Sequence, residues 1–193
     1  MNFLAHIYLS GDSVPITIGN FIGDFLRGVK MESFDSEIQK GIRLHRSIDL
    51  FTDNHDVVMR SKKRLWGKYR HFSGVIVDIY YDHFLAKNWH EFSSVPLDEY
   101  VNNFYNIIIS HKHILPERVN QVLPYMMKEN WLLNYANFEG IDNVMLGMSR
   151  RTKHDSKMEE SVKELKEGYE EFKGDFFEFF SDLEQHVEEY LEK

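Results

Sequence analysis

The sequence predicts an all-α fold that forms a single domain over residues 1–193. Only four prolines occur, at positions 15, 96, 116 and 124, and they leave long intervals without a helix breaker. In those intervals the apolar residues recur every three or four positions, as they do on one face of a helix. We find no internal repeat and no low-complexity linker, and 193 residues are enough for one hydrophobic core.

The first long helix is expected to begin at Ser36. The Ser36 hydroxyl can cap this helix, and Glu37 lies in its first turn. The apolar stripe of the helix comprises Ile38, Ile42, Ile48 and Phe51. A second helix is expected from about 74 to 89, a segment in which apolar and aromatic residues predominate.

Further helices are expected in the second half of the chain. Residues 98–111 have apolar side chains on one face, and Pro116 marks the start of the next helix because proline suits a first turn. The last helix, from about 157 to 192, is expected to be long, acidic and amphipathic. It can bend at its two glycines, Gly168 and Gly174.

Charge is distributed unevenly along the chain. The net charge is −8, but residues 159–193 carry 13 acidic and 4 basic residues, so the remainder is close to neutral. A stretch without acidic residues, called the basic run below, contains Arg60, Lys62, Lys63, Arg64, Lys68 and Arg70. Such a run can dock an acidic protein or a phosphorylated ligand. The alternative is an ordinary solvated helix face that the acidic tail neutralises.

The composition excludes several classes of protein. The chain has no cysteine, which excludes disulfides, thiolate metal sites and a cysteine nucleophile, so any metal must lie among His, Asp and Glu. Residues 1–10 lack the basic start and cleavage site of a signal peptide. No apolar run approaches the roughly 18 residues of a membrane span. We therefore expect a soluble cytoplasmic protein with neither a membrane nor a nucleic acid as its partner.

Two pairs of residues have the four-residue spacing that places side chains on one helix face. His45 and Asp49 form the first pair, which suits metal ligation or acid–base chemistry, although an ordinary ion pair on a helix surface is the alternative. Asp78 and Asp82 form the second pair, among apolar and aromatic neighbours. A buried carboxylate requires a partner, so a metal or a cation is expected there.

Other residues of the types that bind a metal or a phosphate are further candidates for the site. Asp24 follows Gly23 in an apolar stretch, and His83 offers a nitrogen next to Asp82. His6 is either a hydrogen-bonded core residue or a ligand. Imidazoles and carboxylates without thiolates suit Mn, Mg, Fe or Zn. Arg46 and Arg60 can neutralise a phosphate, or they are ordinary surface cations.

In their order and spacing these segments resemble the acyl carrier protein phosphodiesterase family, a divergent branch of the helical HD-domain metal phosphohydrolases. The likeness is strong from residue 1 to about 85 and continues weakly into the tail. The matching segments are Asn2-Phe3-Leu4-Ala5-His6, Gly19-Asn20, Gly23-Asp24-Phe25, Gly41-Ile42, His45-Arg46, Ile48-Asp49, Thr52-Asp53, Asp78 and Asp82-His83-Phe84-Leu85.

The resemblance implies an HD-domain-like helical bundle. It also implies removal of 4′-phosphopantetheine from holo-acyl carrier protein, a reaction linked to fatty acid biosynthesis and lipid metabolism. The implied cofactor is Mn²⁺, with Mg²⁺ or Fe²⁺ as alternatives. The implied metal ligands are Asp24, His45, Asp49, Asp82 and His83, with His6 and Asp78 as ligands or as supports of a ligand. The implied catalytic residues are Asp24, His45, Arg46, Asp49 and Asp78, and Arg46 would hold the phosphate.

Other interpretations stay open at this point. Asp82-His83 reverses the His-Asp pair that names the larger superfamily, and a literal His-Asp pair occurs at His55-Asp56. We interpret that pair as a turn or a helix start, but it is the main rival for the metal. The same metal site would also suit a nucleotide or another small phosphate ester. A helical interaction protein without enzymatic activity is the third possibility.

Overall fold

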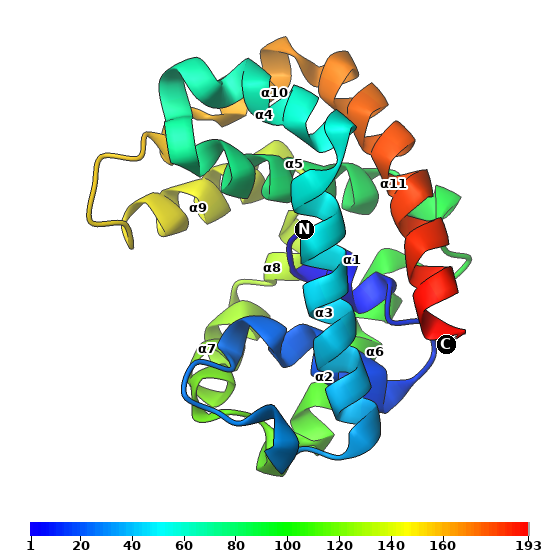
Figure 1. Ribbon diagram of the computed structural model, residues 1–193. Coiled ribbons are helices and arrows are strands. Elements are labelled where there is room, and N and C mark those ends of the chain that lie inside the picture. The colour runs from blue at the N-terminus through cyan, green and yellow to red at the C-terminus, as the bar shows by residue number, and fades with distance from the viewer. Residues whose placement is uncertain (193) are drawn as a thin grey trace.

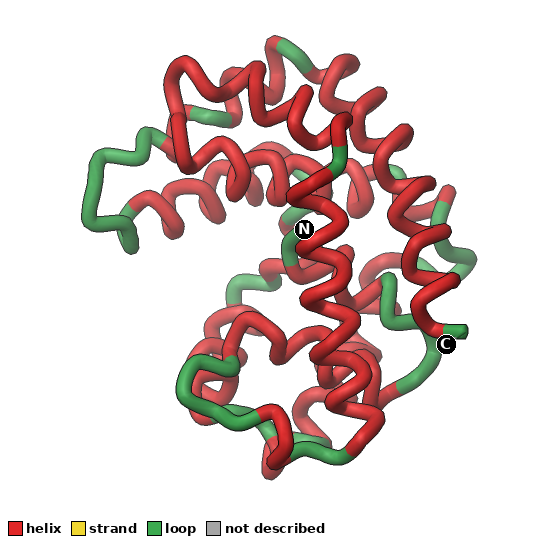
Figure 2. Tube along the Cα trace, in the orientation of Figure 1, coloured by secondary structure: helices red, strands yellow, loops and turns green. Residues whose placement is uncertain are grey.

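The computed structural model describes residues 1–192, in which all regular secondary structure is helical, loops connect the helices and no strand occurs (Figure 2). The α-helices are α1 (Phe3–Tyr8), α2 (Val14–Ile22), α3 (Ser36–Asn54), α4 (Asp56–Tyr69), α5 (Ser73–Lys87), α6 (Leu97–Ser110), α7 (Glu117–Lys128), α8 (Trp131–Asn134), α9 (Phe138–Ser149), α10 (Val162–Glu167) and α11 (Tyr169–Leu191). Short 3₁₀ turns are η1 (Gly23–Phe25), η2 (Met31–Ser33), η3 (Arg70–Phe72), η4 (Trp89–Glu91), η5 (Lys112–Ile114) and η6 (Met158–Glu160). The prediction of an all-α fold is confirmed.

Helix α5 is the central element of the fold. Its residues from Ile76 to Ala86 are buried, except for Asp78, which is half-buried. A helix that is apolar on all sides is stable only when other elements surround it, and α1, α4, α9 and α11 pack against α5. Its buried tyrosines and Phe84 join the aromatic side chains of α11 in one core.

Helices α2 and α3 cross at unusually close range, and two glycines make this possible. A Cβ atom on Gly19 would lie 2.1 Å from the carbonyl oxygen of Ile38, and one on Gly41 would lie 2.3 Å from that of Ile16. Any side chain at either position would therefore push the two backbones apart. In Figure 1, α3 extends from the group of helices around α2, α6 and α7 to the group around α4, α5 and α10. This crossing places residues of α2 beside the middle of α3.

Most helix boundaries lie close to the predicted ones. The helix expected at Ser36 is α3, with Asp35 in the N-cap position, and the segment expected from 74 to 89 is α5 followed by η4. The long acidic helix expected at about 157–192 is instead divided into η6, α10 and α11, with the break at Gly168. Gly174 lies within α11 and does not interrupt it. Within the described residues, no helix is both long enough and apolar enough to cross a membrane.

Candidate metal centre

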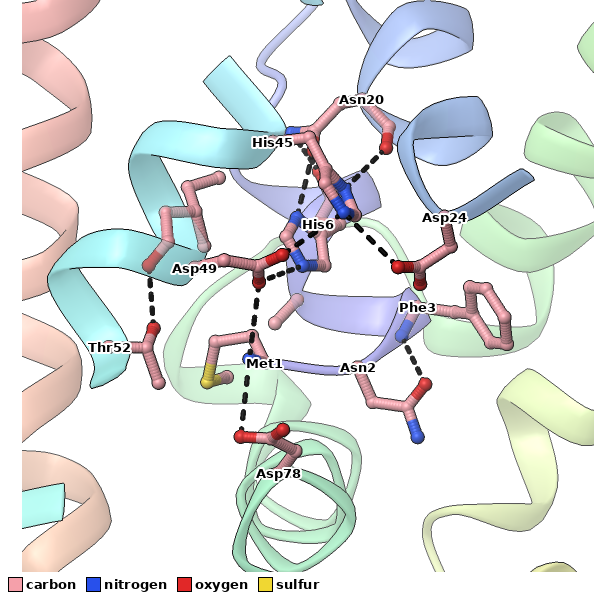
Figure 3. Close-up of polar contacts among 12 residues, drawn as sticks. Met1, Asn2, Phe3, His6, Asn20, Asp24, His45, Asp49, Thr52 and Asp78 are labelled. Carbon is pink, nitrogen blue, oxygen red and sulfur yellow. Dashed lines mark hydrogen bonds and ion pairs between the residues drawn. The ribbon is translucent and has the colours of Figure 1, made fainter. Parts of the chain in front are cut away.

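Two imidazoles and two carboxylates converge where α1, η1 and α3 meet (Figure 3). Asp49 lies between the histidines, with Oδ1 3.2 Å from His6 Nε2 and Oδ2 3.1 Å from His45 Nε2. Asp24 Oδ1 lies 3.3 Å from the same His45 nitrogen. One ligand atom from each of His6, His45 and Asp49 lies within 4.8 Å of the other two. We call these three residues, together with Asp24, the metal cluster.

Asn20 orients both imidazoles of the metal cluster. Its side-chain NH₂ donates to the carbonyl oxygen of His6 at 2.8 Å and to Ser10 Oγ at 3.0 Å, so its Oδ1 accepts from His6 Nδ1 at 2.8 Å. Its backbone carbonyl accepts from His45 Nδ1 at 2.9 Å. Each histidine is thereby held with its proton on Nδ1 and its Nε2 facing the cluster. A partner that fixes the ring in this way is a usual companion of a metal-ligating histidine.

The chemistry of these donors fits a divalent metal ion. His6 Nε2 is buried and makes no hydrogen bond within residues 1–192, although it lies 3.2 Å from the Asp49 carboxylate. Such an orphaned nitrogen requires an explanation, and a cation held by His6, His45 and Asp49 provides one. The side chain of Asp49 is 41% exposed and that of Asp24 is 53% exposed, so the cluster is open to a substrate on that side.

Gly23 allows His45 to reach this position. A Cβ atom at Gly23 would lie 2.3 Å from Cγ of the His45 ring, so no other residue type fits there without moving the imidazole. The rings of His6 and His45 are stacked, with their centroids 4.1 Å apart. The group that lies against Gly23, directly before Asp24, is thus the imidazole of His45.

The electrostatics of the cluster favour charge on its carboxylates. Burial alone would raise the pKa of Asp49 and of Asp24, but the close contacts with the imidazoles of His45 and His6 outweigh it and lower both pKa values. Burial would also lower the pKa of His45, whereas its contacts with Asp24 and Asp49 raise that pKa to about 9. Burial lowers the pKa of His6. A metal ion at this place would therefore meet two carboxylates and a neutral His6, and its binding to His45 would require loss of the proton on Nε2.

Asp78 lies beside the cluster and contacts the amino group of Met1. The nitrogen of Met1 is 3.2 Å from Asp78 Oδ1 and 3.7 Å from Asp49 Oδ1. Burial would lower the pKa of this buried ammonium, but the surrounding carboxylates of Asp78, Asp49 and Asp82 raise it. Asp78 thus takes part in the charge balance around Asp49 and is the acid to which the amino group is closest.

The chain matches a known protein family over nearly its whole length. Residues 1–183 match the family model described as acyl carrier protein phosphodiesterase. The chain belongs to that family.

Curated proteins with the same description resemble the chain over nearly its whole length. The acyl carrier protein phosphodiesterase of Photorhabdus laumondii is 30% identical over 181 residues, which are 93% of this chain and 91% of that protein. The one from Klebsiella pneumoniae is 31% identical over 95% of both chains, and the one from Serratia proteamaculans is 27% identical over 98% of both. No solved structure gives a significant match, so the HD-domain-like character of the bundle stays a prediction.

In this member of the family, Asp82 and His83 lie outside the metal cluster. Asp82 Oδ2 and Oδ1 accept hydrogen bonds from the backbone N–H groups of Leu4 at 2.7 Å and Ala5 at 3.3 Å. His83 Nδ1 donates to the carbonyl oxygen of Tyr135 at 2.7 Å. Consecutive residues point about 100° apart around a helix, so Asp82 faces α1 while His83 faces α8. The resemblance implied that both side chains ligate the metal, whereas in the structure Asp82 contacts backbone N–H groups of α1 and His83 contacts the backbone carbonyl of Tyr135.

We predict that Asp82 supports α1 rather than the metal itself. Burial raises the pKa of Asp82 to about 7. A side chain that accepts a hydrogen bond without carrying a charge is therefore expected to be tolerated at position 82. Asp82→Asn is expected to keep Mn²⁺ affinity within about twofold in calorimetric titration. Asp82→Ala leaves two N–H groups without an acceptor and is expected to lower the free energy of unfolding by about 1–3 kcal/mol in a denaturant titration. Loss of metal binding in Asp82→Asn, equal to the loss in Asp49→Asn, would show that Asp82 is a ligand.

The rival His55-Asp56 pair begins a helix, as the sequence suggested. His55 is the N-cap residue of α4, and its Nδ1 accepts from the backbone N–H of Val57. Its Nε2 lies 3.2 Å from Asp182 on α11. No group of three potential metal ligands forms around this pair within the described residues.

The basic run lies on α4 and in η3, and its cations are largely paired with acidic residues. Arg60 and Arg64 contact Asp175, which is buried on α11, and Lys68 contacts Glu160 and Glu164. Lys62 pairs with Asp53 at 2.8 Å. Lys63 and Arg70 form no ion pair within residues 1–192. These contacts correspond to the second interpretation of the run, in which the acidic tail neutralises it.

Sequence reasoning missed the role of Asn20. The residue lies in one of the segments that carry the family resemblance, but only its place next to Gly19 was noted. The available signal was chemical, because Asn20 is an amide within the apolar run Val14–Ile22 and a buried amide requires hydrogen-bond partners.

Arg46 is exposed and forms no ion pair within the described residues. It precedes Asp49 by three positions on α3, so the two side chains share a face.

Proposed function

We propose that this protein hydrolyses the phosphodiester bond between a serine of holo-acyl carrier protein and 4′-phosphopantetheine. The products are apo-acyl carrier protein and free 4′-phosphopantetheine. The observation that carries the proposal is the convergence of His6, His45 and Asp49 in a chain that belongs to the acyl carrier protein phosphodiesterase family. The same description of its curated relatives supports the choice of substrate.

His6, His45 and Asp49 would hold the metal, which we propose to be Mn²⁺, with Mg²⁺ or Fe²⁺ as alternatives. A nitrogen and oxygen donor set without thiolates is compatible with each of these ions. When bound, the ion supplies Lewis acidity toward a phosphoryl oxygen. Asn20 contributes by keeping the Nδ1 protons of both histidines directed away from the ion.

Asp24 and Arg46 are the residues we propose to act on the substrate. Asp24 is ionised and half-exposed beside His45, so its carboxylate can accept a proton from the attacking water. Water then adds to phosphorus, the bond from phosphorus to the serine oxygen breaks, and the serine oxygen takes up a proton. Arg46, exposed on the same helix as His45, would bind a phosphate oxygen through its N–H donors.

The contact with the acidic carrier protein is a separate part of the proposal. Since Arg60, Arg64 and Lys68 already pair with acidic residues of this chain, they offer little charge to a partner. Lys63 and Arg70 are the members of the basic run that we propose for contact with the carrier protein.

Mass spectrometry of purified holo-acyl carrier protein incubated with the protein and Mn²⁺ tests the reaction. We expect the carrier protein to lose the mass of the phosphopantetheine group, and we expect Asp24→Ala to slow this loss by about 10²-fold or more, as for the removal of a general base. If the carrier protein keeps its mass although Mn²⁺ binds, the substrate is a different phosphate ester. If the carrier protein keeps its mass and Mn²⁺ does not bind either, the protein is not a metal-dependent hydrolase.

A further inference from the structure

A pocket of about 470 Å³ lies between the start of α1 and helices α8 and α9. Asn2 and Phe3 form its wall on the side of α1. On the other side its lining includes Trp131 of α8 and Asn143 and Gly147 of α9. Pockets that hold small organic ligands have volumes of roughly 300–1,000 Å³, so this one is large enough for such a molecule.

The pocket begins next to the metal cluster. The nitrogen of Met1 lies 3.7 Å from Asp49, and Asn2 follows directly, at a Cα distance of about 3.8 Å. Phe3 precedes His6 by three residues, which is about 4.5 Å along a helix axis. In Figure 3, Phe3 lies at the start of α1 below Asp24, and Asn2 lies beneath Phe3. Phe3 also stacks on Phe25, the residue after Asp24, with centroids 5.9 Å apart.

The lining combines apolar surface with amide groups and positive charge. Phe3 and Trp131 provide aromatic surface. The Asn143 amide is exposed and makes no side-chain hydrogen bond within residues 1–192. Arg150 and Arg151 line the pocket after the end of α9, and the guanidinium of Arg151 lies 5.7 Å from the Trp131 ring. An uncharged chain with amide groups and branched methyl groups, attached to a phosphate, matches this combination.

We propose that this pocket binds the pantetheine chain of the substrate while its phosphate lies at the metal cluster. This assignment rests on the proposed function, because the substrate proposed there carries the pantetheine chain. Aromatic surface would contact the dimethyl segment of the chain, and the free amide of Asn143 would pair with one of its amide groups. Arg150 and Arg151 outnumber the one acidic residue of the lining, Glu129, whose carboxylate accepts from Trp131 Nε1 at 2.9 Å, so the lining favours a ligand that carries negative charge over a cationic one.

Gly147 provides a way to fill the pocket without disturbing the fold. A Cβ atom at Gly147 would meet no atom within 4 Å, and a residue with a side chain suits a helix interior better than glycine. Gly147→Leu is therefore expected to fold and to occupy part of the pocket. Gly174 on α11 is the matched control, because a Cβ atom there also meets nothing within 4 Å and Gly174 does not line the pocket.

The experiment compares wild type, Gly147→Leu and Gly174→Leu in two measurements with Mn²⁺ present. The first is kcat/KM for holo-acyl carrier protein, and the second is a titration with pantetheine followed by NMR chemical shifts. We expect Gly147→Leu to lower kcat/KM about tenfold or more and to weaken pantetheine binding. Gly174→Leu is expected to stay within about twofold of wild type in both. Calorimetric titration with Mn²⁺ is expected to give equal affinities for all three proteins.

The outcomes separate this proposal from the proposed function. If Gly147→Leu matches wild type in kcat/KM on holo-acyl carrier protein, the pocket does not hold the pantetheine chain. If wild type leaves holo-acyl carrier protein intact, the proposed function fails, and the pantetheine titration then decides the pocket. Pantetheine binding that Gly147→Leu weakens would support the pocket assignment, and absence of binding to wild type would overturn it.

Discussion

Replacing His45 with alanine is expected to abolish measurable Mn²⁺ binding and to lower the hydrolysis of holo-acyl carrier protein by about 10³-fold or more. The expectation follows from the position of His45, whose Nε2 lies within 3.3 Å of both Asp24 and Asp49. Removing the imidazole takes away one of three ligands and leaves the two carboxylates to repel each other. A metal contributes several kcal/mol to phosphoryl chemistry, and about 1.4 kcal/mol corresponds to a factor of ten in rate.

His186→Ala is the matched control for this variant. His186 is a half-buried histidine on α11 that packs against α3, where its Nε2 lies 2.8 Å from Ser47 Oγ and its ring stacks on Phe51. It takes no part in the metal cluster. We expect near wild-type metal affinity and rate from His186→Ala, measured by calorimetric titration and by the mass-spectrometric assay. Retained Mn²⁺ binding in His45→Ala would show that the metal lies elsewhere.

Replacing Asn20 with alanine is expected to weaken Mn²⁺ binding by about 10–100-fold, the usual effect of losing a residue that orients a metal ligand. Asn20 is fully buried, and its side chain fixes His6 and bonds to Ser10. The substitution removes the acceptor of His6 Nδ1 but keeps the backbone carbonyl that accepts from His45. We therefore expect ¹⁵N NMR of the imidazoles to show a changed tautomer balance for His6 and an unchanged one for His45.

Thr17→Ala tests whether the effect is specific to Asn20. Thr17 lies one turn earlier on α2, is buried, and bonds through Oγ1 to the carbonyl oxygen of Ser13. Its loss is expected to leave both the metal affinity and the His6 tautomer unchanged. Equal changes in Asn20→Ala and Thr17→Ala would mean that Asn20 acts only through the stability of α2.

Much of the fold was predictable because local patterns dominate in a helical protein. The spacing of Ile38, Ile42 and Ile48 identified the buried face of α3, and Pro116 identified the start of α7. The division of the terminal helix at Gly168 was only partly foreseen. The sequence has two glycines in this segment, Gly168 and Gly174, and the local pattern does not distinguish them. In the structure, Phe172 packs close to Gly168, whereas a Cβ atom at Gly174 would meet nothing within 4 Å.

The candidate site was predictable where two residues share one helix. His45 and Asp49 are such a pair, and their convergence follows from helix geometry. His6 remained ambiguous because Asn20, His45 and Asp49 lie 14, 39 and 43 positions away along the chain, and their approach depends on how α1 meets α2 and α3. Asp82 shows the limit of reasoning from burial: its carboxylate does require partners, but these are backbone N–H groups of Leu4 and Ala5, which no side-chain pattern reveals.

A crystal structure of the protein with Mn²⁺, with anomalous diffraction used to locate the ion, tests the central claim most directly. We expect an anomalous peak about 2.1 Å from His6 Nε2, His45 Nε2 and an oxygen of Asp49, and we expect the peak to disappear in His45→Ala crystals. A peak at Asp82 and His83 or at His55-Asp56, with none among His6, His45 and Asp49, would contradict the assignment of the metal centre.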